Sequence, residues 1–301
     1  MQTFKRIFLF IALNFLICIT VLALFTVLGL NGYLHRHHIS TESLFLVCLV
    51  YGMTGAFISL MLSKVIAKWT MGLKMITIYD CSQEGVFLKR VVEKLAKKAG
   101  LAKIPEIGIF TSPTPNAFAT GPTASRSLVA VSTGLLQKLD KEEIEAVIGH
   151  EIAHIKNGDM VTMTLLQGVV NTFVIFLSYI IAQAISMNAK KERSQGTFYL
   201  SRFVLQTIFM ILGSIIVATF SRAREYRADL GGAHLTSPNH MIRALQRLEE
   251  SSKKTLDQET PQSVAALMCN GKMGFLELFS THPPISKRVA ALKKLEESPI
   301  V

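Results

Sequence analysis

The stretch EAVIGHEIAHIKNGDM, residues 145–160, places His150 and His154 four positions apart, with Glu151 directly after the first histidine. On a helix this spacing puts both imidazoles on one face, one turn apart, so that both can reach a single ion. From Val161 the chain continues as a long uncharged stretch that is apolar enough for a bilayer. The sequence therefore predicts a metal site on a helix at the edge of a membrane.

The helix that carries these histidines is predicted to begin at Asp140, because Glu143 three positions later completes a D-x-x-E variant of the capping box. A buried face is indicated by its apolar residues, Ile144, Val147, Ile148 and Ile155. Glu151 adjoins the first histidine and can accept a proton from an attacking water, which is the H-E-x-x-H arrangement of zinc peptidases. The alternative for the bare motif is an ordinary helix with surface histidines.

The composition favours a membrane protein over a nucleic-acid binder. The chain has 301 residues, of which 50% are hydrophobic, and a formal net charge of +11. Much of that charge lies beside apolar runs, at Lys5, Arg6, Lys64, Lys68, Lys74, Arg222, Arg224 and Arg227. This placement suits anionic lipid and topology signals, so we expect no nucleic-acid partner. The scattered cysteines Cys18, Cys48, Cys81 and Cys269 form no C-x-x-C motif and indicate free thiols in a reducing setting.

Four apolar stretches are candidate membrane spans: Ile7–Leu30, Leu44–Leu62, Val161–Met187 and Phe203–Phe220. The first two approach or exceed the roughly 20 residues that a spanning helix needs. The first is too long for a signal peptide and no cleavage site follows it, so we expect a retained anchor. The third is interrupted by polar residues at Gln167, Asn171 and Gln183, and we expect such positions to face protein as well as lipid.

Basic residues near the ends of these spans predict the orientation. Lys5 and Arg6, together with Lys64, Lys68 and Lys74, place the N-terminus and residues 64–160 in the cytoplasm. Two hairpins then return residues 221–301 to the same side. Lys190, Lys191 and Arg193 conflict with an outer loop, which leaves incomplete insertion of the second hairpin as an alternative; we favour full insertion. The histidines at 35, 37 and 38 fit a polar outer connector better than a metal site.

Between the second and third spans the sequence predicts a small α+β portion. Strands are expected at Met75–Asp80, Glu106–Ser112 and Ser127–Thr133, the last pairing with NAFATG (residues 116–121), and an amphipathic helix at Gly85–Gly100. After the fourth span we expect a helix up to Gly231 and Gly232, and a mobile loop at Ser251–Gln262. The expected division is 1–63, 64–160, 161–220 and 221–301.

Catalytic zinc takes three protein ligands, and Glu225 in EYRAD is the candidate for the third. His154 lies seven positions before Val161, and Glu225 lies five after Phe220. If the third and fourth stretches form an antiparallel hairpin, both side chains stand roughly 8–10 Å above the same membrane surface at about 1.5 Å per residue. Asp229 and Asp159 are candidates to orient an imidazole N–H. For Asp159, a capping or interfacial role is an equal alternative.

Four motifs, NAFATG, GHEIAHIKNGD, EYRAD and STHPPISKR, resemble those of the HtpX-type heat-shock membrane proteases, bacterial relatives of the CAAX prenyl proteases. The resemblance covers essentially the whole chain. It implies one zinc ion per chain bound by His150, His154 and Glu225, with Glu151 as general base. It also implies a cytoplasmic-membrane protease that cleaves misfolded membrane proteins in quality control and stress response.

By the same resemblance, His282 and Arg288 are candidates for contacting the substrate or the transition state. Asn116 adjoins a strand edge along which an extended peptide could bind, and its side chain is a candidate contact to the peptide backbone. For these residues a structural role in a loop, an ion pair or a turn is the alternative.

We therefore expect an α+β, mostly α, multi-pass membrane protein whose cytoplasmic domain is zincin-like (gluzincin) and contains a small β-sheet. Its expected partners are membrane-protein or unfolded polypeptide substrates and the lipid bilayer, with the oligomeric state open. The alternatives are a membrane scaffold or holdase with a vestigial site, and a CAAX-type processing protease. A site-2-type intramembrane protease is disfavoured, because charges surround the histidine motif and would be costly in hydrocarbon.

Overall fold

The computed structural model describes residues 40–77, 79–187, 194–259 and 280–297. The chain divides into two compact units, Met1–Ser59 with Thr162–Val217, and Leu60–Val161 with Ala218–Val301. The expectations for the stretch 7–30, for the histidines at 35, 37 and 38, and for the basic residues at 190–193 lie outside the described residues.

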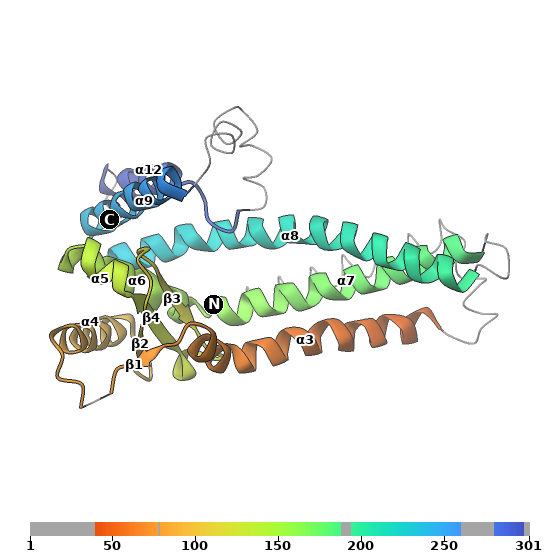
Figure 1. Ribbon diagram of the computed structural model, residues 1–301, viewed down its shortest axis with the longest axis horizontal. Coiled ribbons are helices and arrows are strands. Elements are labelled where there is room, and N and C mark those ends of the chain that lie inside the picture. The colour runs from red at the N-terminus through yellow and green to blue at the C-terminus, as the bar shows by residue number, and fades with distance from the viewer. Residues whose placement is uncertain (1–39, 78, 188–193, 260–279, 298–301) are drawn as a thin grey trace. The chain divides into compact units, whose positions relative to one another are not determined.

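Three long helices dominate the described chain, and each contributes residues to both units: α3 (Thr41–Thr70), α7 (Asp159–Met187) and α8 (Ser194–Leu235) (Figure 1). All three are long and apolar enough to cross a membrane, and each contains one of the expected spans. At about 1.5 Å per residue, the 42 residues of α8 extend about 63 Å, roughly twice the hydrocarbon thickness. The charged segment Arg222–Asp229 therefore lies beyond the apolar segment Phe203–Phe220.

The described part of the first unit is held together by apolar side chains and close helix approaches. Cys48 of α3 packs with Phe176 and Ile180 of α7, and the ring of Phe45 meets that of Phe176 edge-on at 5.5 Å. A Cβ on Gly52 would lie 2.6 Å from the backbone nitrogen of Thr172. Only a glycine allows the two helix backbones to approach this closely.

The second unit contains a four-stranded mixed sheet in the order β1-β2-β4-β3. Its strands are β1 (Lys74–Met75), β2 (Glu106–Phe110), β3 (Ala117–Thr120) and β4 (Leu128–Ser132), with the 3-10 turn η1 (Ala124–Arg126) between β3 and β4. β4 pairs antiparallel with β3, as expected, and parallel with β2, which the sequence did not indicate. All five residues of β4 are buried, as is typical of a central strand.

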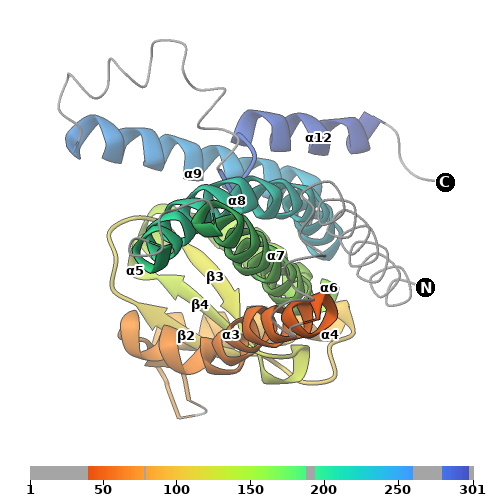
Figure 2. The same cartoon turned by 90° about the vertical axis from the view of Figure 1, so that its right-hand side faces the viewer.

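The described residues of this unit form five further helices: α4 (Gln83–Ala99), α5 (Thr133–Lys138), α6 (Lys141–Asn157), α9 (Pro238–Glu259) and α12 (Ile285–Glu297). The core of the unit joins apolar residues of α4, α6 and α9 to the face of the sheet that carries Ile107 and Val131. α9 and α12 pack against each other (Figures 1 and 2). The helix motif at 145–160 therefore lies between the sheet and α9.

Three expectations about local structure were wrong. The strand at Met75–Asp80 ends as β1 at Met75, because the chain turns there: Asp80 N donates to the carbonyl of Thr77, and Asp80 Oδ1 accepts from Ser82 N. The helix does not end at Gly231 and Gly232 but continues to Leu235. Ser251–Glu259, expected in a mobile loop, belongs to α9, which has no glycine or proline after Pro238 to interrupt it.

Candidate metal centre

The helix α6 is fixed at both ends by local signals. Asp140 Oδ1 accepts from the backbone of Glu143 at 2.7 Å, and Glu143 Oε2 accepts from the backbone of Asp140 at 3.0 Å, which completes the expected capping box. Gly158 ends the helix with φ 65°, a left-handed conformation that glycine adopts without strain. His150, Glu151 and His154 are all buried on this helix. The sequence thus holds both histidines on a rigid element.

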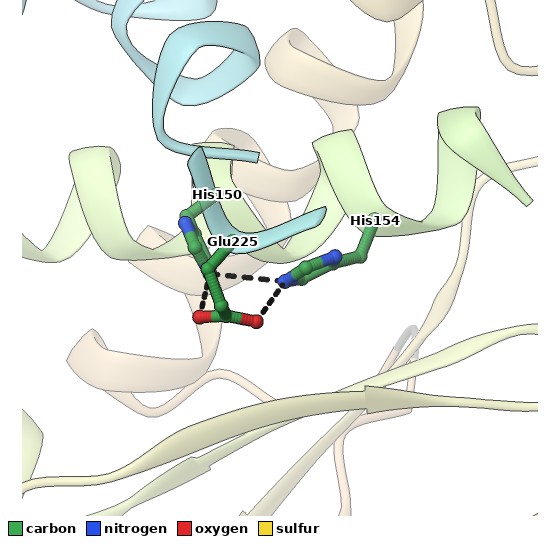
Figure 3. Close-up of side chains that lie close together, drawn as sticks. All are labelled: His150, His154 and Glu225. Atoms are coloured by element: carbon green, nitrogen blue, oxygen red, sulfur yellow. Dashed lines mark hydrogen bonds and ion pairs between the residues drawn. The ribbon is translucent and has the colours of Figure 1, made fainter. Parts of the chain in front are cut away.

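The two histidines meet Glu225 of α8 in one cluster (Figure 3). Their Nε2 atoms are 3.0 Å apart, and the two rings are nearly perpendicular, at 89°. Glu225 Oε1 lies 3.3 Å from Nε2 of His154, and Glu225 Oε2 lies 3.6 Å from Nε2 of His150. One ligand atom from each residue lies within 4.8 Å of the others, so the three could hold a single metal ion.

The far nitrogen of each ring faces a carboxylate. Nδ1 of His150 lies 2.9 Å from Asp229 Oδ1, and Nδ1 of His154 lies 2.7 Å from Asp159 Oδ2. In a neutral imidazole that donates from Nδ1, Nε2 carries a lone pair and no proton. The two Nε2 lone pairs then lie close to each other and to a carboxylate, and a bound cation would stabilise this arrangement. Two imidazole nitrogens and one carboxylate oxygen are a usual set of zinc ligands.

The hydrogen bonding and the charge balance of the cluster also favour a bound cation. Among the described residues, the buried Oε1 of Glu225 and the buried Nδ1 of His150 make no hydrogen bond of good geometry, although His154 Nε2 lies 3.3 Å from the first and Asp229 Oδ1 lies 2.9 Å from the second. The cluster contains more carboxylates than arginines. The carboxylates are those of Glu151, Glu225, Asp159 and Asp229, and the arginines are Arg288 and the peripheral Arg227. A divalent cation with two nitrogen ligands and one carboxylate ligand matches zinc best.

Two glycines of α8 allow Glu225 to reach α6. A Cβ on Gly231 would lie 2.6 Å from Cβ of Ala153, and one on Gly232 would lie 2.9 Å from the backbone nitrogen of His150. Such distances exclude a side chain at either position unless a helix shifts. The glycine pair therefore marks a close helix–helix approach, not the helix end expected from the sequence.

His282 and Arg288 also lie at the cluster. His282 Nδ1 is 2.7 Å from Glu225 Oε2, while the side chain of His282 is 63% exposed. Arg288 is buried on α12 and donates to both carboxylate oxygens of Asp229, at 2.7 Å from Nε and 2.5 Å from Nη2. Arg288 thus holds the carboxylate that faces His150, a contact that the sequence did not suggest.

The electrostatics of the cluster follow from these contacts. Burial alone would lower the pKa of His150, but its contacts with Asp229 and Glu225 outweigh burial and raise that pKa to about 9. The pKa of His154 is raised in the same way, by Asp159 and Glu225 against burial. Burial opposes ionisation of Glu225, yet contacts with the three histidines hold its pKa far below the usual range. A proton and a metal ion compete for the same histidine lone pairs.

The cluster opens into a cavity of about 260 Å³. Its polar lining includes Glu151, which lies beside the ligands, and Asn116, which precedes β3. Both backbone groups of Asn116 bond to Ser132 at the end of β4: its N–H donates to Ser132 Oγ, and its carbonyl accepts from Ser132 N, both at 2.9 Å. Among the described residues, β3 pairs only with β4. The other edge of β3 therefore has no strand beside it and could pair with an extended peptide.

The apolar part of the cavity lining was not predicted from the sequence. It comes from Leu135, Val147, Met241, Ala244, Leu245 and Leu248, of which the last four belong to α9. The amphipathic spacing of Met241, Leu245 and Leu248 is the signal that could have indicated a buried face here. It could not have told which element that face meets.

Comparison with known proteins gives the family. The model of "Peptidase family M48" matches residues 82–296 of this chain, which include α6, Glu225 and Arg288. The chain belongs to peptidase family M48.

Relatives in this family match over the full length. A "Protease HtpX homolog" of Janthinobacterium sp. (strain Marseille) is 47% identical over 298 residues, covering 97% of this chain and all of the relative. A "Protease HtpX" of Shewanella baltica (strain OS195) is 45% identical over 295 residues, covering 96% and 99%. This M48 chain is therefore a membrane-bound metalloendopeptidase that hydrolyses peptide bonds.

Among solved structures, the crystal structure of S. mikatae Ste24p is similar with a TM-score of 0.59 and 20% sequence identity. The match covers 94% of this chain and 64% of the Ste24p chain. At this identity the similarity concerns the fold alone, and it agrees with a mostly helical membrane protein that contains a small mixed sheet.

Proposed function

We propose that His150, His154 and Glu225 bind a single zinc ion and that Glu151 is the general base of peptide hydrolysis. One observation supports this above all. The two Nε2 atoms lie 3.0 Å apart beside the carboxylate of Glu225, while each Nδ1 atom lies within 2.9 Å of another carboxylate oxygen. Histidine ligands whose second ring nitrogen faces a carboxylate are typical of protein zinc sites.

Each residue then has a defined part in the reaction. Bound zinc supplies a Lewis acid that makes water nucleophilic near neutral pH. Glu151, buried and lining the same cavity, accepts the proton of that water and returns it to the leaving amine. Asp229 and Asp159 hold the two imidazole rings. On this proposal His282, whose side chain is exposed and contacts Glu225, also contacts the scissile carbonyl.

The substrate on this proposal is an extended, unfolded polypeptide. The open edge of β3 adjoins the cavity, and a peptide that adds to this edge forms backbone hydrogen bonds that do not depend on its sequence. Asn116 stands where that peptide would enter. Such recognition suits the removal of misfolded or damaged membrane proteins, in which segments that should be folded are exposed.

Purified full-length wild type and Glu151→Gln, both loaded with zinc, test this function on an unstructured membrane-protein substrate. We expect cleavage by wild type and a loss of at least about 100-fold in the variant, since general-base catalysis contributes about 10²–10⁴-fold. Equal cleavage by both would contradict the mechanism. Zinc binding without cleavage by either would favour a scaffold or holdase, and cleavage restricted to prenylated C-termini a CAAX-type protease.

We further propose four spans in two hairpins of the bacterial cytoplasmic membrane, with residues 64–160 and 221–301 on the cytoplasmic side. Lys64 and Lys68 in the last turns of α3, and Lys74 of β1, support this orientation. Cys81, which is exposed in the second unit, allows a direct test in a variant whose other cysteines are serine. A membrane-impermeant maleimide should label inverted membrane vesicles and not intact spheroplasts; the reverse pattern would refute the orientation.

A further inference from the structure

The last turns of α3 carry an exposed apolar ridge that belongs to the second unit. It consists of four residues at helical spacing: Leu62, Val65, Ile66 and Trp69. Residues at i, i+3, i+4 and i+7 share one face of a helix, and all four side chains on this face are exposed, Trp69 to 86%. The sequence predicted a span that ends at Leu62. Most of the ridge therefore lies beyond the expected membrane boundary.

The ridge continues an exposed apolar face of the span. Tyr51 and Ile58 precede Leu62 on the same face, eleven and four positions earlier, and both are exposed as well. At about 1.5 Å per residue, Trp69 stands about 10 Å beyond Leu62 along the helix axis. The face that lipid would cover along the span thus continues to Trp69 with the same chemistry.

The two lysines beside the ridge do not interrupt it, because both bind a carboxylate of the sheet. Lys64 Nζ lies 2.6 Å from Glu106 Oε1, and Lys68 Nζ lies 2.8 Å from Glu106 Oε2. Glu106 is the first residue of β2, so both lysines face the sheet. Pairing lowers the cost of placing charged groups at the level of a membrane. The lysines that suggested a boundary therefore do not exclude lipid from the ridge.

The helix ends directly after Trp69. Leu73 N donates to the carbonyl of Lys68 at 3.1 Å, and Gly72, with φ 56°, turns the chain into β1. The indole thus lies at the last turn of a long apolar helix. Tryptophan is enriched at membrane–water interfaces because its ring is apolar and its N–H can donate to headgroup oxygens. This position suits the boundary of a bilayer.

Two further lysines lie near this end of α3. Lys74 follows Trp69 by five positions, and Lys103 precedes Glu106, the partner of the α3 lysines, by three. Both are exposed, and neither makes an ion pair with a described residue. Ile104, next to Lys103, is an exposed apolar residue. Basic side chains beside exposed apolar ones suit a layer of anionic lipid headgroups.

We infer that the ridge Leu62–Trp69 is a membrane-docking face of the second unit, seated in the interfacial layer of the bilayer with Trp69 at headgroup level. Lys74 and Lys103 contact anionic headgroups beside it. Continuity with the exposed face of the span favours lipid over a protein partner. The bilayer then reaches about 10 Å further along α3 than the sequence indicated. Through Glu106 it holds the sheet of the peptidase unit close to the membrane surface.

Trp69 is the only tryptophan of the chain, so the native protein carries its own probe at this position. The full-length protein is reconstituted into vesicles of phosphatidylcholine and phosphatidylglycerol, with lipids brominated near the glycerol end of the acyl chains. We expect the brominated lipids to quench most of the Trp69 fluorescence and aqueous iodide to quench little of it. Quenching by iodide alone would place the ridge in water and overturn the inference. Protection from both quenchers would mean that a second copy or another protein segment covers the ridge, and would equally overturn it.

A relocated tryptophan is the matched control. Trp69→Phe keeps the ridge apolar, and Gln246→Trp in the same chain places the indole on the exposed face of α9. In this double variant we expect quenching by iodide and none by brominated lipid. Quenching by brominated lipid there as well would show that the signal is not specific to the ridge, and would count against the inference.

The headgroup preference is tested by placing bromine on only one of the two lipids. Brominated phosphatidylglycerol should quench Trp69 more strongly than the same fraction of brominated phosphatidylcholine, since each lysine near an anionic surface contributes up to about fivefold in affinity. Lys74→Gln combined with Lys103→Gln should abolish this difference, whereas Lys138→Gln at the end of α5 should retain it. Equal quenching by both lipids in the wild type would refute the role of the two lysines. None of these measurements uses peptide cleavage, so their failure would leave the proposed function intact.

Discussion

Gly232→Ala tests whether the helix contact between α8 and α6 sets the geometry of the metal centre. The new Cβ would lie 2.9 Å from the backbone nitrogen of His150 and 3.1 Å from its Cα. The optimal separation of such atoms is about 3.5–4.0 Å, so the two helices must separate by about 0.5–1 Å. Because His150 and Glu225 lie on opposite sides of this contact, the displacement falls directly on the ligand set.

The effects on stability and on catalysis should differ in size. Alanine improves the helix propensity at this position by about 0.5–1 kcal/mol, and overpacking costs about 1–3 kcal/mol, so the net loss of stability is about 0–2.5 kcal/mol. A misplacement of about 1 Å in a catalytic constellation costs up to about 100-fold in rate. We therefore expect a folded variant whose kcat/KM falls about 10–100-fold and whose zinc affinity also falls.

The matched control is Gly196→Ala in the same helix, where the added Cβ meets no other part of the described chain within 4 Å, its own helix turn aside. That variant should keep wild-type kcat/KM and gain slightly in stability. The measurements are peptide cleavage, zinc affinity by chelator competition, and thermal unfolding in detergent. If Gly232→Ala matches Gly196→Ala in both activity and zinc affinity, the close approach does not set the site geometry and the reasoning fails.

Two further outcomes follow from named contacts. Asp159→Ala removes the 2.7 Å partner of His154 and should weaken zinc binding about 10–100-fold, measured by chelator competition; an unchanged affinity would exclude an orienting role for Asp159. Burial raises the pKa of Glu106, but hydrogen bonds from Lys64 and Lys68 outweigh it and lower that pKa overall. The stabilisation is therefore present above the unfolded pKa of about 4.3 and is lost as the pH falls through the folded value. Since Glu106 is half exposed, Glu106→Gln should lower the free energy of unfolding by less than about 1 kcal/mol at pH 7, measured by denaturant titration, with the difference vanishing in acid. A difference that grew as the pH fell would contradict this sign.

Elements with local signals could be predicted from the sequence. The capping box of Asp140 and Glu143 was confirmed, as was the end of α4 at Gly100, which adopts φ 75°. Both signals involve residues within one turn of each other, so no distant contact can override them. The pairing of NAFATG with the following strand was also confirmed. It could be predicted because only a short connection separates the two segments.

Features that depend on distant contacts could not be predicted. The parallel pairing of β2 with β4 needs the crossover through β3, and periodicity does not specify partners. Gly231 and Gly232 carry the ordinary signal of a helix end, and only the position of α6 shows that they serve close packing. The apolar cavity lining from α9 is separated from the histidines by about ninety positions of sequence. Amphipathic spacing indicates a buried face without saying what it faces.

The two histidines differ in how the carboxylates behind them are neutralised. Asp229, behind His150, is 1% exposed and receives two hydrogen bonds from the buried Arg288. Asp159, behind His154, faces Arg227 at 4.0 Å, and the side chain of Arg227 is 58% exposed. A buried carboxylate without a partner costs several kcal/mol, so Asp229 depends on Arg288 to remain ionised. We therefore propose that Arg288 supports His150 through Asp229, while its Nη1 also lies 3.6 Å from Glu225 Oε2 at the edge of the cavity.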